Sequence, residues 1–93
     1  MKNRLPVQNR GDRDVCLFIE PYGEDFWMKP GDSFTVVPIR EQSNVEFSVV
    51  VAADLLTVWL YEDGDPYNAI LDYEVVDAHG SKLACGHQRP ADV

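Results

Sequence analysis

Short runs of β-branched and aromatic residues, each followed by turn residues, are the feature that most limits how this chain can fold. Residues 44–53 show it most clearly, because valine and phenylalanine side chains on one side alternate with Glu46 and Ser48 on the other. A period of two is typical of a strand that is buried on one face. Only the stretch around Ala52 and Ala53 could compete as a helical turn, and its β-branched and aromatic neighbours favour strands. We therefore predict an all-β fold, a compact and mainly antiparallel sandwich of about seven short strands.

The predicted strands cover most of the chain. They are Leu5–Gln8 and residues 14–20, 24–28, 33–39, 44–53, 55–61 and 67–77, with 81–88 as a further short candidate. Pro38 lacks a backbone N–H, so the strand at 33–39 is either an edge strand or ends its ladder at this residue. Residues 29–32 (KPGD) predict a type II turn, because Gly31 accepts the positive φ that the third position of this turn requires.

Length and hydropathy point to one domain, residues 1–93. No apolar run approaches the roughly 18 residues that a membrane helix needs. Residues 1–14 are charged and lack the apolar segment of a secretory signal. We therefore expect a soluble, cytoplasmic protein without membrane contact, unless a leader was removed. Cys16 and Cys85 would then stay reduced.

The net charge of −8 lies in one part of the chain. Residues 41–93 contain ten acidic groups against Lys82 and Arg89, whereas residues 1–40 are balanced. Such a surface repels a phosphate backbone, so we exclude nucleic acid as a partner. A basic partner protein or a cation is compatible with it, although acidity alone also serves solubility.

Residues 28–37 (MKPGDSFTVV) resemble a turn-and-strand found in cupredoxin-like sandwiches and in other small β-domains. The longer segment 19–37 resembles the N-terminal part of short uncharacterised bacterial proteins. The resemblance implies an immunoglobulin- or cupredoxin-like layering and no activity. Cupredoxins bind copper through an upstream histidine and a C-terminal Cys-His-Met cluster. Here no histidine precedes His79 and no methionine follows Met28, which disfavours a copper site.

Three side chains near the C-terminus could ligate a metal, namely His79, Cys85 and His87. Their spacing matches no standard zinc motif, and each is equally well explained by a turn or a strand end. The acidic stretch 61–68 departs from the ligand positions of a calcium loop and fits a hairpin loop. The sequence therefore predicts no cofactor, and a metal-binding or redox domain using these three residues is kept as an alternative.

Catalytic groupings are missing from the sequence, since no serine or cysteine lies in a recognisable nucleophile motif and no glycine loop cradles phosphate. We therefore predict that the protein is not an enzyme. The aromatic residues are the best functional signal. If Phe26 and Met28 point into the core, Trp27 points outward, and the same alternation in residues 55–61 turns Trp59 and Tyr61 outward.

Solvent-facing aromatic side chains mark binding surfaces. The predicted binding residues are Trp27, Trp59, Tyr61 and Tyr22. We expect a non-enzymatic binding or assembly module that uses these aromatics and an acidic flank, with a protein partner or with itself. In a second alternative, a carbohydrate-binding module, Trp27 and Trp59 would stack on sugar rings. The aromatic hypothesis fails if both sheet faces are covered or if the tryptophan face is the core.

Overall fold

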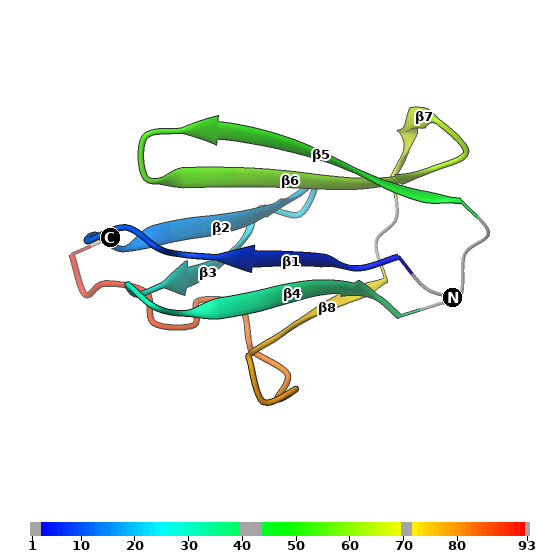
Figure 1. The fold of residues 1–93 in the computed structure, drawn as a ribbon. Coiled ribbons are helices and arrows are strands. Elements are labelled where there is room, and N and C mark those ends of the chain that lie inside the picture. Colours follow the sequence, from blue (N-terminus) through cyan, green and yellow to red (C-terminus); the bar gives the residue numbers. More distant parts are fainter. Residues whose placement is uncertain (1–2, 40–43, 70–71, 93) are drawn as a thin grey trace.

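A computed structural model describes residues 3–39, 44–69 and 72–92 of the chain (Figure 1). Within these residues the protein is all-β, with eight strands and no helix. The strands are β1 (Leu5–Gln8), β2 (Val15–Glu20), β3 (Glu24–Met28), β4 (Ser33–Pro38), β5 (Val45–Ala52), β6 (Leu55–Glu62), β7 (Asp65–Ala69) and β8 (Tyr73–Val76). The predicted all-β class is confirmed.

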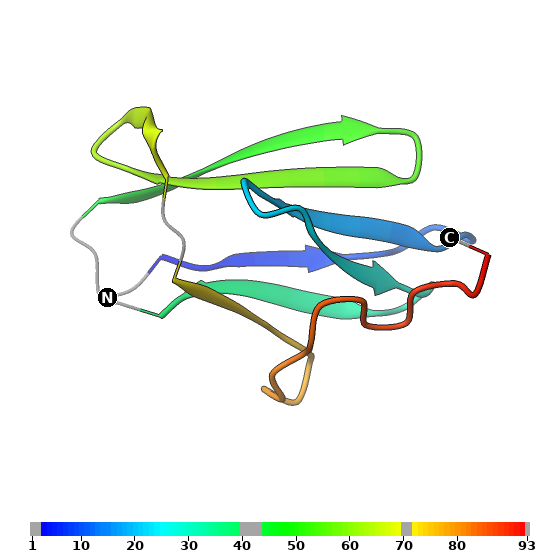
Figure 2. The same ribbon diagram turned by 180° about the vertical axis from the view of Figure 1, so that it is seen from behind.

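The strands form a sandwich of two sheets, seen from opposite sides in Figures 1 and 2. One sheet has three strands in the order β1-β4-β8. The other has five, in the order β3-β2-β6-β5, with β7 also paired to β6. Neighbouring strands run antiparallel except for β2 and β6, which are parallel. Because β2 pairs directly with β6, the β2–β3 hairpin and the β5–β6 hairpin lie side by side in one sheet.

Alternating apolar side chains from both sheets form the core between them. The fully or nearly fully buried members of this core cluster are Leu17, Ile19, Phe26, Met28, Phe34, Val36, Val45, Val58, Leu60 and Val75. In β3 the alternation places Phe26 and Met28 inside, at 3% and 0% exposure, and leaves Trp27 partly exposed. In β6 it places Val58 and Leu60 inside. Of the two orientations left open for these strands, the observed one therefore turns the tryptophans away from the core.

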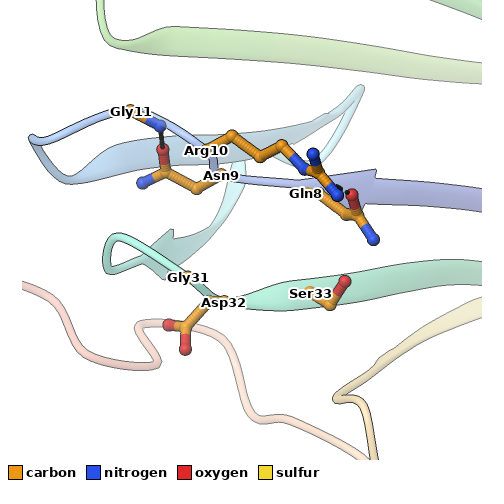
Figure 3. A pocket seen from close by; sticks show the side chains of 7 residues that line it. All are labelled: Gln8, Asn9, Arg10, Gly11, Gly31, Asp32 and Ser33. Carbon is orange, nitrogen blue, oxygen red and sulfur yellow. Dashed lines mark hydrogen bonds between the residues drawn. The ribbon is translucent and has the colours of Figure 1, made fainter.

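The Lys29–Asp32 turn is held against the β1–β2 loop by one buried polar side chain, Asn9, which is 5% exposed. Its Nδ2 donates to the carbonyl oxygens of Met28 (2.9 Å) and Arg13 (2.8 Å), and its Oδ1 accepts from the Gly11 N–H at 3.0 Å (Figure 3). The Gly31 N–H donates to the Asn9 carbonyl at 2.8 Å, and Gly31 has the expected positive φ, 91°. Buried amides are costly unless they are satisfied, and Asn9 uses its side chain to satisfy three backbone groups.

Two predicted strands are wrong in detail. Residues 67–77 are not one strand, since β7 pairs in the five-stranded sheet and β8 in the three-stranded sheet, and residues 70–71 between them lie outside the described part. Residues 81–88 form isolated bridges, not a strand. The positive φ of Gly86 (85°) and Gln88 (57°) interrupts extended geometry there. The strand that contains Pro38, β4, is central in its sheet and not an edge strand. Its ladder ends at Pro38, as one of the two predictions for this residue had it.

Candidate functional site

The outer face of the five-stranded sheet carries most of the aromatic side chains that the core does not use. Because side chains alternate along each strand, the residues that flank the core positions of β2, β3 and β6 point to this face. The strand register brings Cys16 level with both Trp27 and Leu55, and Glu20 level with Trp59. The outward residues of these three strands are Cys16, Phe18, Glu20, Asp25, Trp27, Leu55, Thr57, Trp59 and Tyr61.

A hollow of about 560 Å³ lies at the Trp27 end of this face. Trp27, Phe18 and Leu55 line it, together with Cys16, which is only 6% exposed although it points away from the core. Burial and, to a lesser extent, the nearby Asp25 carboxylate raise the pKa of the Cys16 thiol to about 11, against the opposing effect of Arg89. The thiol is therefore neutral at physiological pH and acts as a small apolar side chain.

Trp27 is fixed in place by a charged hydrogen-bond network around Asp25. The indole Nε1–H donates to Asp25 Oδ2 at 2.8 Å. The Arg89 guanidinium binds the same carboxylate with two hydrogen bonds, from Nε to Oδ2 (2.7 Å) and from Nη2 to Oδ1 (2.5 Å). The hydrogen bonds from Arg89, followed by those from Trp27 and Cys85, hold the pKa of Asp25 below its usual range despite the opposing effect of burial. A bidentate pair of this kind holds a fixed geometry, so the indole is presented in one orientation.

A second hollow, of about 350 Å³, lies further along β6 and is lined by Ser48, Trp59, Tyr61 and Tyr67. Tyr67 belongs to β7, is 95% exposed and contributes to the lining of this hollow. A hydrogen bond to Glu46, burial and the charge of that carboxylate together raise the pKa of Tyr61. Glu46 pairs with Tyr61 across the β5–β6 ladder. The hollow thus combines three aromatic rings with a carboxylate at its margin.

The two hollows lie at opposite ends of one surface. Trp59 is four residues beyond Leu55 on β6, which corresponds to about 13 Å along the strand, and β6 is two strands away from β3. Trp27 and Trp59 are therefore roughly 16 Å apart at their backbones. Phe18 and Thr57 lie on the same face between them. The surface is suited to an extended ligand, because one small ring could not contact both tryptophans.

Three of the four predicted binding residues, Trp27, Trp59 and Tyr61, are thus brought to a single face. Tyr22 is not, since it lies in the turn between β2 and β3, is 63% exposed and lines neither hollow. Sequence reasoning missed Phe18 and Tyr67. Alternation within β2 could have found Phe18, whose core neighbours Leu17 and Ile19 are apolar. Tyr67 depends on the pairing of β7 with β6, for which the sequence carries no local signal.

The predicted metal candidates are not brought together. His79 is exposed in a turn, where its backbone N–H donates to Asp77 Oδ1. Cys85 is exposed, with its sulfur 3.5 Å from Asp25 Oδ1. The His87 ring packs edge-on against Phe34, with the centroids 5.6 Å apart. Across residues 3–39, 44–69 and 72–92, no group of three or more His, Cys, Asp or Glu side chains is placed to hold a metal ion.

A third hollow, of about 360 Å³, separates the β1–β2 loop from the β3–β4 turn (Figure 3). Its polar groups are largely engaged with one another. Arg10 Nε donates to Gln8 Oε1 at 3.2 Å, and Asn9 Oδ1 accepts from Gly11. These contacts shape the two loops, so this hollow is explained by the fold and needs no ligand.

No family model, curated protein or solved structure matches this chain. No helix long and apolar enough to cross a membrane occurs in the described residues. The geometry and chemistry of the aromatic outer face of the five-stranded sheet are therefore the observations that bear on function.

Proposed function

We propose that this protein is a non-enzymatic binding module, and that it contacts a protein partner through the aromatic outer face of the five-stranded sheet. The observation that carries the proposal is the position of Trp27, Phe18, Trp59 and Tyr61 on one face that the core does not need. Aromatic side chains on the solvent-facing side of a sheet lower solubility unless a partner covers them. Tryptophan and tyrosine are enriched at protein–protein interfaces.

Charge indicates the kind of partner segment. The hollow at Trp59 has Glu46 at its margin and Glu20 level with Trp59 across the β2–β6 ladder. The chain as a whole has a net charge of −8. A lysine or arginine side chain over an aromatic ring gains a cation–π attraction, and a neighbouring carboxylate adds to it. We therefore propose a partner segment that places a cationic side chain between Trp59 and Tyr61.

The proposed setting is the cytoplasm. Cys16 and Cys85 form no disulfide, which suits a reducing compartment. Cys16 is buried and Cys85 is exposed, so the Cys85 thiol would be open to oxidation in an oxidising compartment.

Carbohydrate binding is the second candidate, and the shared face of Trp27 and Trp59 is the observation that favours it. Stacking on sugar rings needs aromatic surface and neutral hydrogen-bonding groups. The carboxylates beside Trp59 favour a cationic ligand over a neutral one. A metal-binding or redox function has less support, because His79, Cys85 and His87 are not clustered.

A fluorescence titration tests the proposal. In a Trp27→Phe variant, Trp59 is the only tryptophan, so its emission reports on the second hollow. We expect a lysine-rich peptide to change this emission, and the affinity to fall as salt screens the charges. The matched peptide with glutamine in place of lysine should bind at least several-fold more weakly. In the same background, Glu46→Gln should also weaken binding of the lysine peptide.

Two results would contradict the proposal. Equal binding of the lysine and glutamine peptides would remove the role of charge. A response to neutral oligosaccharides without a response to either peptide would favour the carbohydrate-binding alternative.

A further inference from the structure

The strand edges of the two sheets differ in how they are protected. The β3 edge is covered by the C-terminal segment, where the Trp27 N–H donates to the His87 carbonyl at 2.8 Å and the Gly86 N–H to the Asp25 carbonyl at 2.6 Å. The same segment reaches β8, where the Leu83 N–H donates to the Val75 carbonyl at 2.8 Å. The β1 edge is only four residues long and contains a proline. Short strands, proline and covering segments are the usual ways in which proteins block edge pairing.

Over the described residues, the β5 edge lacks these protections from Phe47 to Ala52, whereas at its start the Val45 carbonyl accepts from the Asn3 side-chain amide. Among the described strands, β6 is the only one that pairs with β5, and β5 is eight residues long. It has neither proline nor charge from Phe47 to Ala52. Val49, Val50 and Val51 are 43%, 55% and 71% exposed. Val49 and Val51 continue the inward side of the strand beyond the region that the core cluster covers, so both faces of this stretch are open.

Hairpin geometry identifies the backbone groups that face the open edge. Ala52 pairs with Leu55 around a two-residue loop, and the pair that closes such a loop is hydrogen-bonded across the hairpin. Hydrogen-bonded pairs alternate, so residues 50, 48 and 46 also bond to β6. The Asp63 N–H donates to the Asn44 carbonyl at 3.0 Å. Residue 44, the next even-numbered position, is therefore bonded on the β6 side as well. The N–H and C=O groups of Phe47, Val49 and Val51 therefore point away from β6.

We propose that β5 pairs antiparallel with β5 of a second copy of this chain, centred on Val49, so that the two five-stranded sheets become one continuous sheet. In this register Val49 faces Val49 of the other copy, and Phe47 faces Val51. All of these residues direct their backbone groups to the open edge, as a hydrogen-bonded ladder requires.

Side-chain chemistry favours a second copy as the occupant. In the proposed register Ser48 faces Val50, and Glu46 faces Ala52, so no carboxylate lies directly opposite another. Val49 and Val51 of the two copies meet on the inner side of the joined sheet and extend one apolar strip, while Val50 lies on the other side. The twofold axis is perpendicular to the sheet, which leaves the aromatic faces of both copies exposed on one side. The pairing involves β5 of each copy and does not require the proposed partner.

Sedimentation velocity on the full chain over a wide concentration range tests this pairing. We expect wild-type protein to pass from monomer to dimer as concentration rises. Val49→Lys should weaken dimerisation by at least about tenfold, because it places two lysines directly opposite each other at the twofold axis. Val50→Lys is the matched control. Its lysine faces Ser48 of the other copy, so the dimer should be largely retained.

A charge-complementation experiment distinguishes charge repulsion at position 49 from misfolding of the variant. Val49→Glu should also be monomeric, yet an equimolar mixture of the Val49→Lys and Val49→Glu proteins should form a heterodimer, because position 49 pairs with its own counterpart. Wild-type protein that stays monomeric up to millimolar concentration would overturn the proposal. So would equal effects of Val49→Lys and Val50→Lys, or a mixture that stays monomeric.

Discussion

The outer faces of the two sheets carry different chemistry. On the three-stranded sheet, a hollow of about 500 Å³ is lined by polar, charged and small aliphatic residues that include no aromatic side chain, among them Arg4, Thr35 and Glu74. On the five-stranded sheet, Trp27 and Trp59 lie in two hollows together with other aromatic rings. Both faces belong to the same small sandwich and meet the same solvent.

The contrast between the two faces shows which side chains the fold requires. A sandwich needs apolar side chains on the inner faces of its sheets, and here those positions are filled by the core cluster. The outer face of the three-stranded sheet shows that polar residues suffice outside. The tryptophans on the other outer face are therefore not required by the fold, which supports the proposed role of this face in binding.

The largest expected effect concerns which side of β3 supports the core. Phe26→Ala should lower the free energy of unfolding by about 3–5 kcal/mol, because it leaves a cavity where a ring is 3% exposed. Trp27→Ala, one residue along the strand, should cost about 1 kcal/mol or less, since its ring is on the outer face. Urea denaturation of both variants measures the difference. If Trp27→Ala unfolds the protein while Phe26→Ala is tolerated, the assignment of inner and outer faces is wrong.

A smaller effect is expected from the network that orients Trp27. The pKa of Asp25 is lowered in the folded protein, so its ionised form stabilises the fold above the usual carboxyl value of about 3.8, and this contribution is lost as pH falls below it. Asp25→Asn should lower Tm at pH 7 by about 4–8 °C, corresponding to about 1 kcal/mol for a partly exposed pair.

The gap in Tm between wild type and Asp25→Asn should then shrink as the pH is lowered from 5 to 2. Thermal unfolding monitored by circular dichroism at several pH values measures it. A gap that stays constant over this range would show that the charge of Asp25 contributes nothing to stability.

The smallest effect is expected at the turn that joins β5 to β6, which lines the Trp27 hollow. Ala53 has a φ of 49°, a region that disfavours side chains other than glycine. Ala53→Gly should raise the free energy of unfolding by about 0.5–1 kcal/mol and leave peptide binding unchanged. The control, Ala52→Gly in the adjoining strand, should destabilise instead. Destabilisation by Ala53→Gly would show that the turn is not strained.

Local patterns in the sequence predicted a good part of this arrangement. Alternation in residues 24–28 and 55–61 correctly placed Phe26 on the side opposite Trp27 and Val58 on the side opposite Trp59, because a strand has only two faces, but it left open which side is the core. The glycine of the KPGD turn has the positive φ that its position requires. These features depend on neighbours in the chain, so the sequence is enough to predict them.

Features that depend on distant pairing were not predictable. The parallel β2–β6 ladder places Trp27 and Trp59 in one sheet. Nothing in the sequence of either strand indicates which strand it pairs with. Alternation assigned Val49 and Val51 to the inner side but could not show that the core ends before them. The bond from Asn9 to the Met28 carbonyl joins residues 19 positions apart, and an asparagine before Arg-Gly looks like any loop residue.

The most direct test of the binding proposal compares the two outer faces within one experiment. In ¹H–¹⁵N correlation spectra, addition of a lysine-rich peptide should shift the Trp59 indole signal and the Ser48 and Tyr61 amides, whereas Thr35 and Glu74 on the three-stranded sheet should stay unchanged. The glutamine-substituted peptide should shift neither set at the same concentration. Shifts confined to Thr35 and Glu74, or no shifts at either face, would contradict the assignment of the aromatic face as the binding surface.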